Sequence, residues 1–276
     1  MTIHKRLTTK EISPSYWRVV IENPPINLYD PEMFAELRVL MDRIEADQEL
    51  KVIVFESANP DYFVAHYDLV RGEVIPEVNG AAEFSAWPNF VTRLAQSPVV
   101  SIAMVRGRAR GHGSELALAC DMRFASREKA VFAQVEVGVA VVPGGGATEW
   151  LAALAGRSRA LEIIMGADDF DADTAEKYGW VNRSIPDAEL DTFVDNYARR
   201  VASFDKRALE LAKKLVNARA GVPSDADRWS SNQAFVGTTG WPNTQRLVTK
   251  MLDAGLQQAG DVEYRLGHHV ARLNQE

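Results

Sequence analysis

Residues 99–121 read VVSIAMVRGRARGHGSELALACD, and this stretch decides the fold. Residues 99–105 are mostly apolar and rich in valine, which is typical of a buried strand. Glycines at positions 107, 111 and 113 allow a tight turn and let backbone N–H groups approach a ligand closely. Residues 114–119 then have helical character. A strand that passes through a glycine-rich turn into a helix is typical of a β/α unit.

Similar segments surround this unit in the first half of the chain. Apolar, β-branched runs predict further strands at residues 17–21, 51–55, 122–125 and 130–132. Apolar residues at helical spacing predict helices at 33–44 and 84–96, and Asp30-Pro31 forms a start signal for the first of them. Strands that alternate with helices at this spacing predict an α/β fold of stacked right-handed β/α units.

The second half of the chain is predominantly helical after about residue 148. Helices are predicted at residues 149–154, 159–165, 172–178, 189–203 and 206–218. Gly221-Val222-Pro223-Ser224 is typical of a linker, and residues 225–276 have the character of a helical tail. We therefore expect a β/α core over residues 1–220 and a helical C-terminal region over residues 221–276.

The composition narrows the class of protein. The chain has 276 residues, with 31 Lys and Arg against 38 Asp and Glu, so its net charge of −7 argues against a nucleic-acid-binding surface. A hydrophobic fraction of 46% argues against disorder. The single cysteine excludes a disulfide framework and fits a reducing compartment. No apolar run approaches the roughly 20 residues that span a bilayer, and the first residues lack a secretory signal, so we expect a soluble, cytoplasmic protein.

Two more segments carry residues suited to chemistry. Residues 61–69 (DYFVAHYDL) follow one predicted strand, and residues 134–138 (QVEVG) precede a second glycine run, Gly144-Gly145-Gly146, that opens a helix. Glu136 lies between two valines, and a carboxylate among apolar neighbours is costly unless it is paired or used. Neither glycine cluster is a phosphate loop, because no Gly-Lys-Ser/Thr follows, and residues 111–116 lack the third glycine of a dinucleotide fingerprint.

In this order and spacing, the three segments resemble the crotonase (enoyl-CoA hydratase/isomerase) superfamily. Residues 111–121 resemble the glycine and glutamate signature of the family, and Gln134-Val135-Glu136 before the glycine run resembles its second catalytic segment. The resemblance covers roughly residues 15–218. It implies an α/β fold with a crotonase-like stacked ββα superhelical core, a helical C-terminal region, and reversible addition of water to a 2-enoyl-CoA as the activity of an acyl-CoA hydratase or isomerase.

The resemblance also implies roles for particular residues. Family members hold an acyl-CoA thioester oxygen in an oxyanion hole of two backbone N–H groups, which by position are those of Tyr67 and His112. Glu115 is implied to activate water, and Glu136 to exchange the α-proton. Paired carboxylates at one small site would raise the pKa of at least one of them. The remaining residues implied to contact the substrate are Ala65, His66, Gly113 and Gly144.

The chain departs from the family pattern at two histidines. His66 and His112 stand where glycine is common, and they could narrow the pocket, bond a polar substituent or take part in chemistry other than hydration. Arg106, Arg108 and Arg110 alternate with a period of two, so a strand would place them on one face. They could meet the phosphates of CoA, but a solvated sheet edge is the interpretation we favour.

The resemblance implies partners as well. Coenzyme A would enter only as part of the substrate, no other cofactor is expected, and no metal is expected because the His and Glu residues match no zinc spacing. The family assembles as homotrimers or homohexamers through the helical region, with which the apolar residues Leu247, Met251 and Leu252 are compatible. Residues 264–269 do not align with the aromatic and basic residues that the family places over adenine.

Two other functions remain open at this point. A crotonase-fold hydrolase would cleave a C–C bond or a thioester, with His66 or His112 as a base. A non-enzymatic relative would bind RNA or act as a scaffold, but the acidic balance and the two glutamates argue against it. Residues 70–88, which we expect to shape the acyl pocket, are too irregular to interpret.

Overall fold

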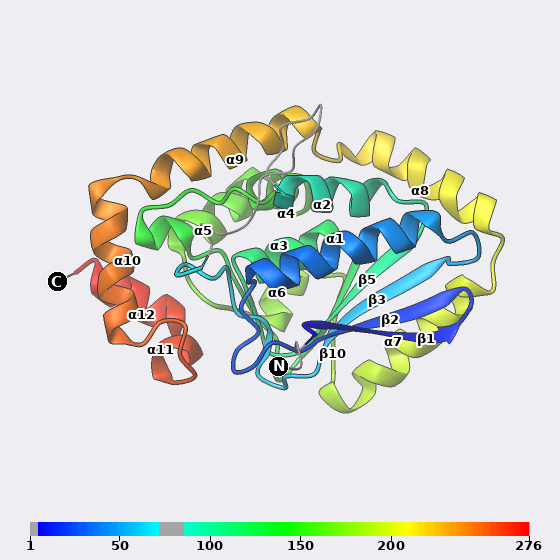
Figure 1. The fold of residues 1–276 in the computed structure, drawn as a ribbon, viewed down its shortest axis with the longest axis horizontal. Helices are drawn as coiled ribbons and strands as arrows, with labels where there is room; N and C mark the ends of the chain where they lie inside the picture. Colours follow the sequence, from blue (N-terminus) through cyan, green and yellow to red (C-terminus); the bar gives the residue numbers. More distant parts are fainter. Residues whose placement is uncertain (1–4, 72–85, 276) are drawn as a thin grey trace.

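The computed structural model describes residues 5–71 and 86–275. The larger of its sheets has helices on both faces (Figure 1). The sheet order is β1-β2-β3-β5-β7-β10, in which β1 and β2 are antiparallel and the other neighbours are parallel. These strands are β1 (Leu7–Ser13), β2 (Tyr16–Ile21), β3 (Val52–Ser57), β5 (Val100–Val105), β7 (Met122–Ser126) and β10 (Arg183–Ile185). The strands predicted at 17–21, 51–55, 99–105 and 122–125 are thus confirmed.

A smaller sheet turns the β/α units into ββα units. Its order is β4 (Tyr62–Val64), β6 (Arg108–Arg110), β8 (Val131–Ala133) and β9 (Phe170–Asp171). In each repeat the chain runs from the larger sheet to the smaller one and then enters a helix, as in β5, β6 and α3 (His112–Ala119). This arrangement confirms the stacked ββα core, and it brings the ends of β4, β6 and β8 to one place.

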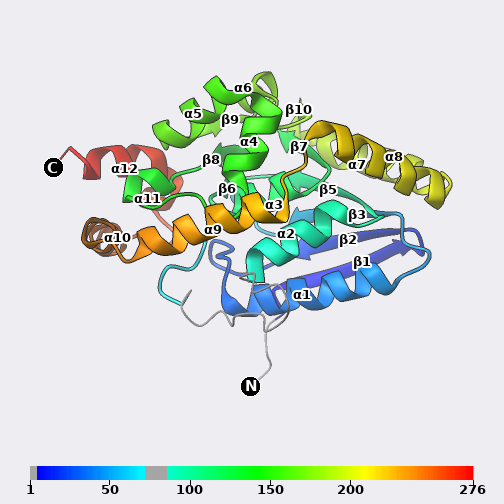
Figure 2. The same cartoon turned by 90° about the horizontal axis from the view of Figure 1, so that it is seen from above.

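The helices that follow the strands pack against one another beside the sheets (Figure 2). Helix α1 (Pro31–Ala46) begins where the sequence predicts, since the carboxylate of Asp30 accepts a hydrogen bond from the N–H of Met33. Helix α2 (Ala86–Gln96) contacts α1 and α3, and α3 contacts α4 (Ala147–Ala155). The described residues do not include 72–85. This gap contains the first two residues of the helix predicted at 84–96 and most of the irregular stretch 70–88.

The second half of the chain is helical, as predicted. Helix α7 (Asp187–Ala202) covers the other face of the larger sheet. The other helices between α4 and residue 221 are α5 (Arg157–Gly166), α6 (Ala172–Tyr178) and α8 (Lys206–Ala220). Gly221 ends α8 with a φ of +65°, and residues 221–224, predicted to be a linker, separate α8 from the next helix. Among the described residues, no helix has both the length and the apolar character that crossing a membrane requires.

The tail after the linker folds back onto the core at one end of the molecule (Figure 1). It comprises α9 (Asp225–Thr239), α10 (Pro242–Ala254), α11 (Asp261–Tyr264) and α12 (Leu266–Leu273). Met251 and Leu266 are buried against Val135 from the loop after β8. Met251, whose spacing is compatible with a subunit contact, therefore packs within its own chain.

Candidate active site

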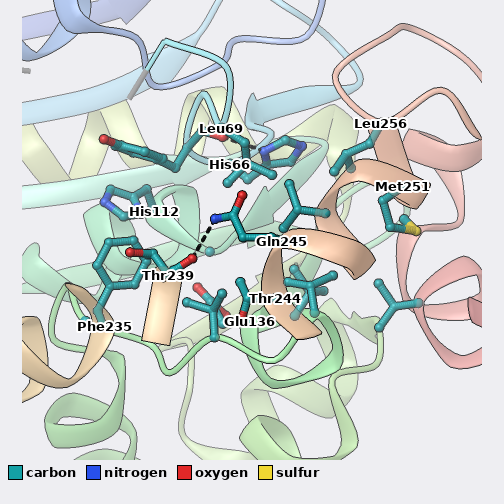
Figure 3. Close-up of a pocket in the computed structure, with 18 of the residues that line it drawn as sticks. His66, Leu69, His112, Glu136, Phe235, Thr239, Thr244, Gln245, Met251 and Leu256 are labelled. Carbon is teal, nitrogen blue, oxygen red and sulfur yellow. Dashed lines mark hydrogen bonds between the residues drawn. The ribbon is translucent and has the colours of Figure 1, made fainter. Parts of the chain in front are cut away.

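A cavity of about 530 Å³ lies between the core and the C-terminal helices (Figure 3). Such a volume is in the range of small-molecule sites. Segments from the core line one part of it, with His66, His112 and Glu136 on different sides (Figure 3). Helices α9, α10 and α12 close the rest, and most of their contribution is apolar. The apolar residues that these helices contribute are Phe235, Val236, Val248, Met251, Leu266 and Val270, and the polar ones include Thr239, Thr244 and Gln245.

The loop after β4 carries the first predicted N–H donor. Tyr29 donates its N–H to the carbonyl of His66 at 2.8 Å, and Asp68 donates its N–H to the carbonyl of Tyr29 at 3.1 Å. In a trans peptide the N–H points opposite to the preceding carbonyl, so the N–H of Tyr67 is directed away from Tyr29. These two hydrogen bonds form an isolated parallel β-bridge between Tyr29 and Tyr67. This bridge fixes the direction of the Tyr67 N–H, and Tyr67 itself lines the cavity.

The turn from β6 into α3 carries the second predicted donor. Gly111 has a φ of +48°, which favours glycine, and it precedes His112, the first residue of the helix. The first N–H groups of a helix have no acceptor within it and lie at its positive end. Gly113 packs so tightly that an added Cβ would lie 2.1 Å from the carbonyl oxygen of Val64. This packing holds α3 against the end of β4, and the rings of Tyr67 and His112 lie 4.8 Å apart.

Glu115 is buried behind His112 and does not itself line the cavity. Its Oε1 accepts the N–H of Gly145 at 2.7 Å. Its Oε2 lies 3.4 Å from Nδ1 of His112 and has no hydrogen-bond partner among the residues that the structure describes. Burial raises the pKa of Glu115 to about 8, and the nearby Glu136 carboxylate contributes to this increase. Glu115 is therefore a carboxyl group that can hold a proton near neutral pH.

Glu136 lines the cavity at the start of the 3₁₀ helix η2 (Glu136–Val139). The amide of Gln134 donates to both of its oxygens, at 3.2 and 3.3 Å. Burial raises the pKa of Glu136 to about 7, although the positive charge of His66 works in the opposite direction. The structure thus brings two carboxyl groups with raised pKa values to the same site, one at the cavity wall and one behind it.

The two histidines differ in charge. Burial and the charge of His66 lower the pKa of His112 to about 3, so the His112 ring is neutral. It packs among the rings of Tyr29, Tyr67 and Trp87. Burial alone would lower the pKa of His66, but the carboxylate of Glu263 outweighs it and raises that pKa. Each histidine therefore narrows the cavity as part of its wall.

Of the predicted substrate contacts, His66 and Gly144 line the cavity, whereas Ala65 and Gly113 do not. Ala65 is fully buried and donates its N–H to the carbonyl of Asn27 at 3.2 Å. Gly113 packs against the backbone of Val64 and not against the cavity. These two residues support the loop and the helix start from behind.

The interpretation of the three arginines as a solvated sheet edge is wrong. Arg110 is fully buried and forms a two-bond ion pair with Asp169, both bonds at 2.7 Å. Arg106 is paired with Asp187 at 2.7 Å, and Arg108 lies over the ring of Tyr264. Burial of an unpaired guanidinium is costly, and the carboxylate that pairs with Arg110, Asp169, lies 59 residues away in the sequence.

Sequence reasoning missed the residues that the C-terminal helices contribute. Phe235 and Gln245 line the cavity, and the amide of Gln245 donates to the carbonyl of Thr239 at 2.6 Å (Figure 3). Glu263 of α11 reaches His66 with a bond of 2.8 Å. These residues belong to a tail that has no motif, and only its folding over the core places them at the site.

The structure thus has an α/β fold with two acids beside a cavity of ligand size, and comparisons with known proteins identify the family. The family model described as enoyl-CoA hydratase/isomerase matches residues 11–245. The chain therefore belongs to the enoyl-CoA hydratase/isomerase family, that is, to the crotonase superfamily.

Individual relatives agree with this assignment. The chain is 32% identical to the short-chain-enoyl-CoA hydratase of Clostridium acetobutylicum over 213 residues, which cover 76% of this chain and 79% of that relative. It is 32% identical to the crotonyl-CoA hydratase of Syntrophomonas wolfei over 212 residues, with the same coverage of 76% and 79%. A crystal structure provisionally assigned as an enoyl-CoA hydratase from Streptomyces avermitilis is 36% identical and superimposes with a TM-score of 0.92 over 98% of each chain.

Proposed function

We propose that this protein adds water reversibly to the double bond of a 2-enoyl-CoA. The observation that carries the proposal is the pair of carboxyl groups Glu136, which lines the cavity, and Glu115, which lies behind its wall, with pKa values raised to about 7 and about 8. Hydration needs one group that accepts a proton from water and one that delivers a proton to the α-carbon. The names of the relatives support the same reaction.

In this proposal the thioester oxygen accepts hydrogen bonds from the N–H groups of Tyr67 and His112. The bridge to Tyr29 directs the first of these N–H groups, and the start of α3 presents the second. Such donors stabilise the enolate-like charge that develops during the reaction, and they need no reorganisation. Glu115 activates the water, and Glu136 exchanges the α-proton. Coenzyme A is part of the substrate, and neither a metal nor another cofactor takes part.

Hydration of crotonyl-CoA is the direct test of the proposal. Turnover that is lost in both Glu115→Gln and Glu136→Gln supports the assigned roles. Calorimetry with an unreactive acyl-CoA measures binding separately. The proposal is abandoned if no acyl-CoA is turned over and none binds.

The activity should have a bell-shaped dependence on pH. Both carboxyl groups carry protons below about pH 7, so no base is present, and both are ionised above about pH 8, so no acid is present. The pair must carry one proton in either direction, on Glu136 for hydration and on Glu115 for dehydration, so kcat/KM should peak between these values in both directions. Initial rates at low substrate concentration give the profile. A single limb near the ordinary glutamate pKa of about 4.3 would contradict this account.

The hydrolase alternative requires a histidine base, and the two histidines are poorly suited to that role. Both ring nitrogens of His66 are occupied by hydrogen bonds, and the pKa of His112 is lowered to about 3. We expect His112→Ala to retain hydration activity within about tenfold, because the backbone N–H remains. A catalytic base would instead lose about 10²- to 10⁴-fold. Steady-state kinetics with crotonyl-CoA and with its thioester hydrolysis as a second readout distinguish the two outcomes.

The assembly that we propose is a homotrimer or homohexamer in the cytoplasm. Val236 and Trp241, in the region from residue 221 onward, are 53% and 54% exposed, which supports a contact between subunits there. The single cysteine supports a reducing compartment. Light scattering coupled to size-exclusion chromatography measures the mass of the assembly, and a monomer would contradict this part of the proposal.

A further inference from the structure

The hydrogen bonds of His66 determine which of its ring nitrogens carry protons. Nδ1 lies 2.8 Å from the carbonyl oxygen of Tyr67, which can only accept, so Nδ1 carries a proton. Nε2 lies 2.8 Å from Oε1 of Glu263, and this oxygen also accepts the backbone N–H of Gln257 at 2.7 Å. Burial would raise the pKa of Glu263, but the charge and the hydrogen bond of His66 outweigh it and lower that pKa, so Glu263 is a carboxylate and accepts a hydrogen bond from Nε2. Both ring nitrogens are therefore donors, and His66 is an imidazolium.

Glu263 is built into the fold as the partner of this imidazolium. It is fully buried, although it lies on the four-residue helix α11 near the end of the chain. Its backbone carbonyl accepts a hydrogen bond from Arg110, whose charge is balanced by Asp169. Gln257 extends the connection, since its side chain accepts the N–H of Leu69 at 2.7 Å.

We propose that Glu263 is a positioning residue for the active site. Its carboxylate holds His66 as an imidazolium, which holds the Tyr67–Asp68 peptide, next along the chain from the one that carries the Tyr67 N–H, through the bond to the Tyr67 carbonyl and places a positive charge beside Glu136. The proposal rests on the proposed function, because it assigns Glu136 as the group that exchanges the α-proton. Glu263 itself does not line the cavity and acts only through His66.

Four charged or titratable groups influence His66 from the elements around it. They are Glu263 of α11, Glu136 of η2, Arg110 of β6 and His112 of α3. Of these, Glu263 is the one whose side chain hydrogen-bonds to the ring. Arg110 is neutralised by Asp169 and His112 is neutral, so the positive charge that Glu136 experiences is mainly that of His66.

The charge of His66 has a definite effect on the pH profile. A positive charge near a carboxyl group favours its ionised form and lowers its pKa. If Glu263→Gln removes the reason for His66 to be protonated, the pKa of Glu136 rises. The acid limb of the kcat/KM profile should then move by about one pH unit to higher pH, since Glu136 is the more acidic of the two catalytic carboxyl groups.

The protonation state is measured first, in the absence of any substrate. Nitrogen NMR of histidine-labelled protein distinguishes an imidazolium from a neutral ring, and His66→Gln assigns the signal among the five histidines. We expect both nitrogens of His66 to remain protonated at pH 7 and the ring to become neutral in Glu263→Gln. A neutral His66 ring in the wild-type protein would overturn the proposal. This result does not depend on the reaction, so it separates a failure of the inference from a failure of the proposed function.

Kinetics then test the coupling to the active site. Asp261→Asn is the matched control, because Asp261 lies on the same helix, is exposed and pairs only with Arg265 and His269 among the described residues. We expect this control to keep the wild-type pH profile and Glu263→Gln to shift the acid limb. The double variant His66→Gln/Glu263→Gln should have the same limb as Glu263→Gln alone, because the charge is already lost. An unshifted limb in a folded Glu263→Gln protein, or a further shift in the double variant, would refute the positioning role.

Discussion

Replacing Glu136 by glutamine should lower kcat for crotonyl-CoA hydration by about 10²- to 10⁴-fold, the usual contribution of a general acid or base. Glutamine has the same shape but cannot exchange a proton, so substrate binding should change little. Glu115→Gln should cause a loss of similar size, because each carboxyl group serves one of the two proton transfers. Steady-state kinetics combined with calorimetric binding of an unreactive acyl-CoA separate catalysis from binding.

The control for these variants is Glu189→Gln on the exposed surface of α7, which should retain full activity. Neither active-site variant should be less stable than the wild type at pH 8. Burial raises the pKa of both carboxyl groups, so their ionisation destabilises the folded state as pH rises from about 4.3 through the raised values. Glutamine removes that penalty. Retention of more than a tenth of the activity in either variant would refute the corresponding role.

Gly113→Ala should lower both the stability and the activity of the protein. Its Cβ would lie 2.1 Å from the carbonyl oxygen of Val64, so the backbone of α3 or β4 must move. Such overpacking costs about 1–3 kcal/mol and more where backbone atoms collide. We expect the melting temperature to fall by about 5–10 °C and kcat/KM to fall by about 10²-fold, because His112 is displaced relative to Tyr67.

Gly166→Ala is the matched control for this substitution. Gly166 lies in α5 with no atom within 4 Å of an added Cβ, and it lies outside the cavity lining. Alanine should therefore leave the activity unchanged and stabilise the helix by up to about 1 kcal/mol. If Gly113→Ala had the same melting temperature and the same kcat/KM as Gly166→Ala, the close packing of α3 on β4 would not hold the site in place.

Most of the ββα core could be predicted, because its long strands and helices carry strong apolar patterns. The run at residues 99–105 and the helix at 33–44 are examples, since each buries side chains at a regular spacing. Strands β4 and β6 could not be predicted, because each has three residues and forms only by pairing across the chain. Strand β1 was missed since its residues are mostly exposed and polar.

Some residues of the candidate site could likewise be predicted from the sequence, and others could not. Glu115, Glu136, Tyr67 and His112 could be proposed from segments that resemble the family, and the structure brings them together. Glu263 could not, because it lies 197 residues from His66 and no local pattern connects the two. Long-range ion pairs of buried charges depend on the tertiary fold, and a sequence pattern does not encode them locally.

The central claim is that the N–H groups of Tyr67 and His112 converge on the oxygen of a thioester within reach of Glu136. A crystal structure with a bound 3-ketoacyl-CoA, whose enolate form resembles the reacting anion, measures this directly. We predict that the thioester oxygen lies about 2.7–3.1 Å from both nitrogens, with the α-carbon facing Glu136. A thioester oxygen that contacts neither nitrogen, or an acyl chain bound away from Glu136, would contradict the account.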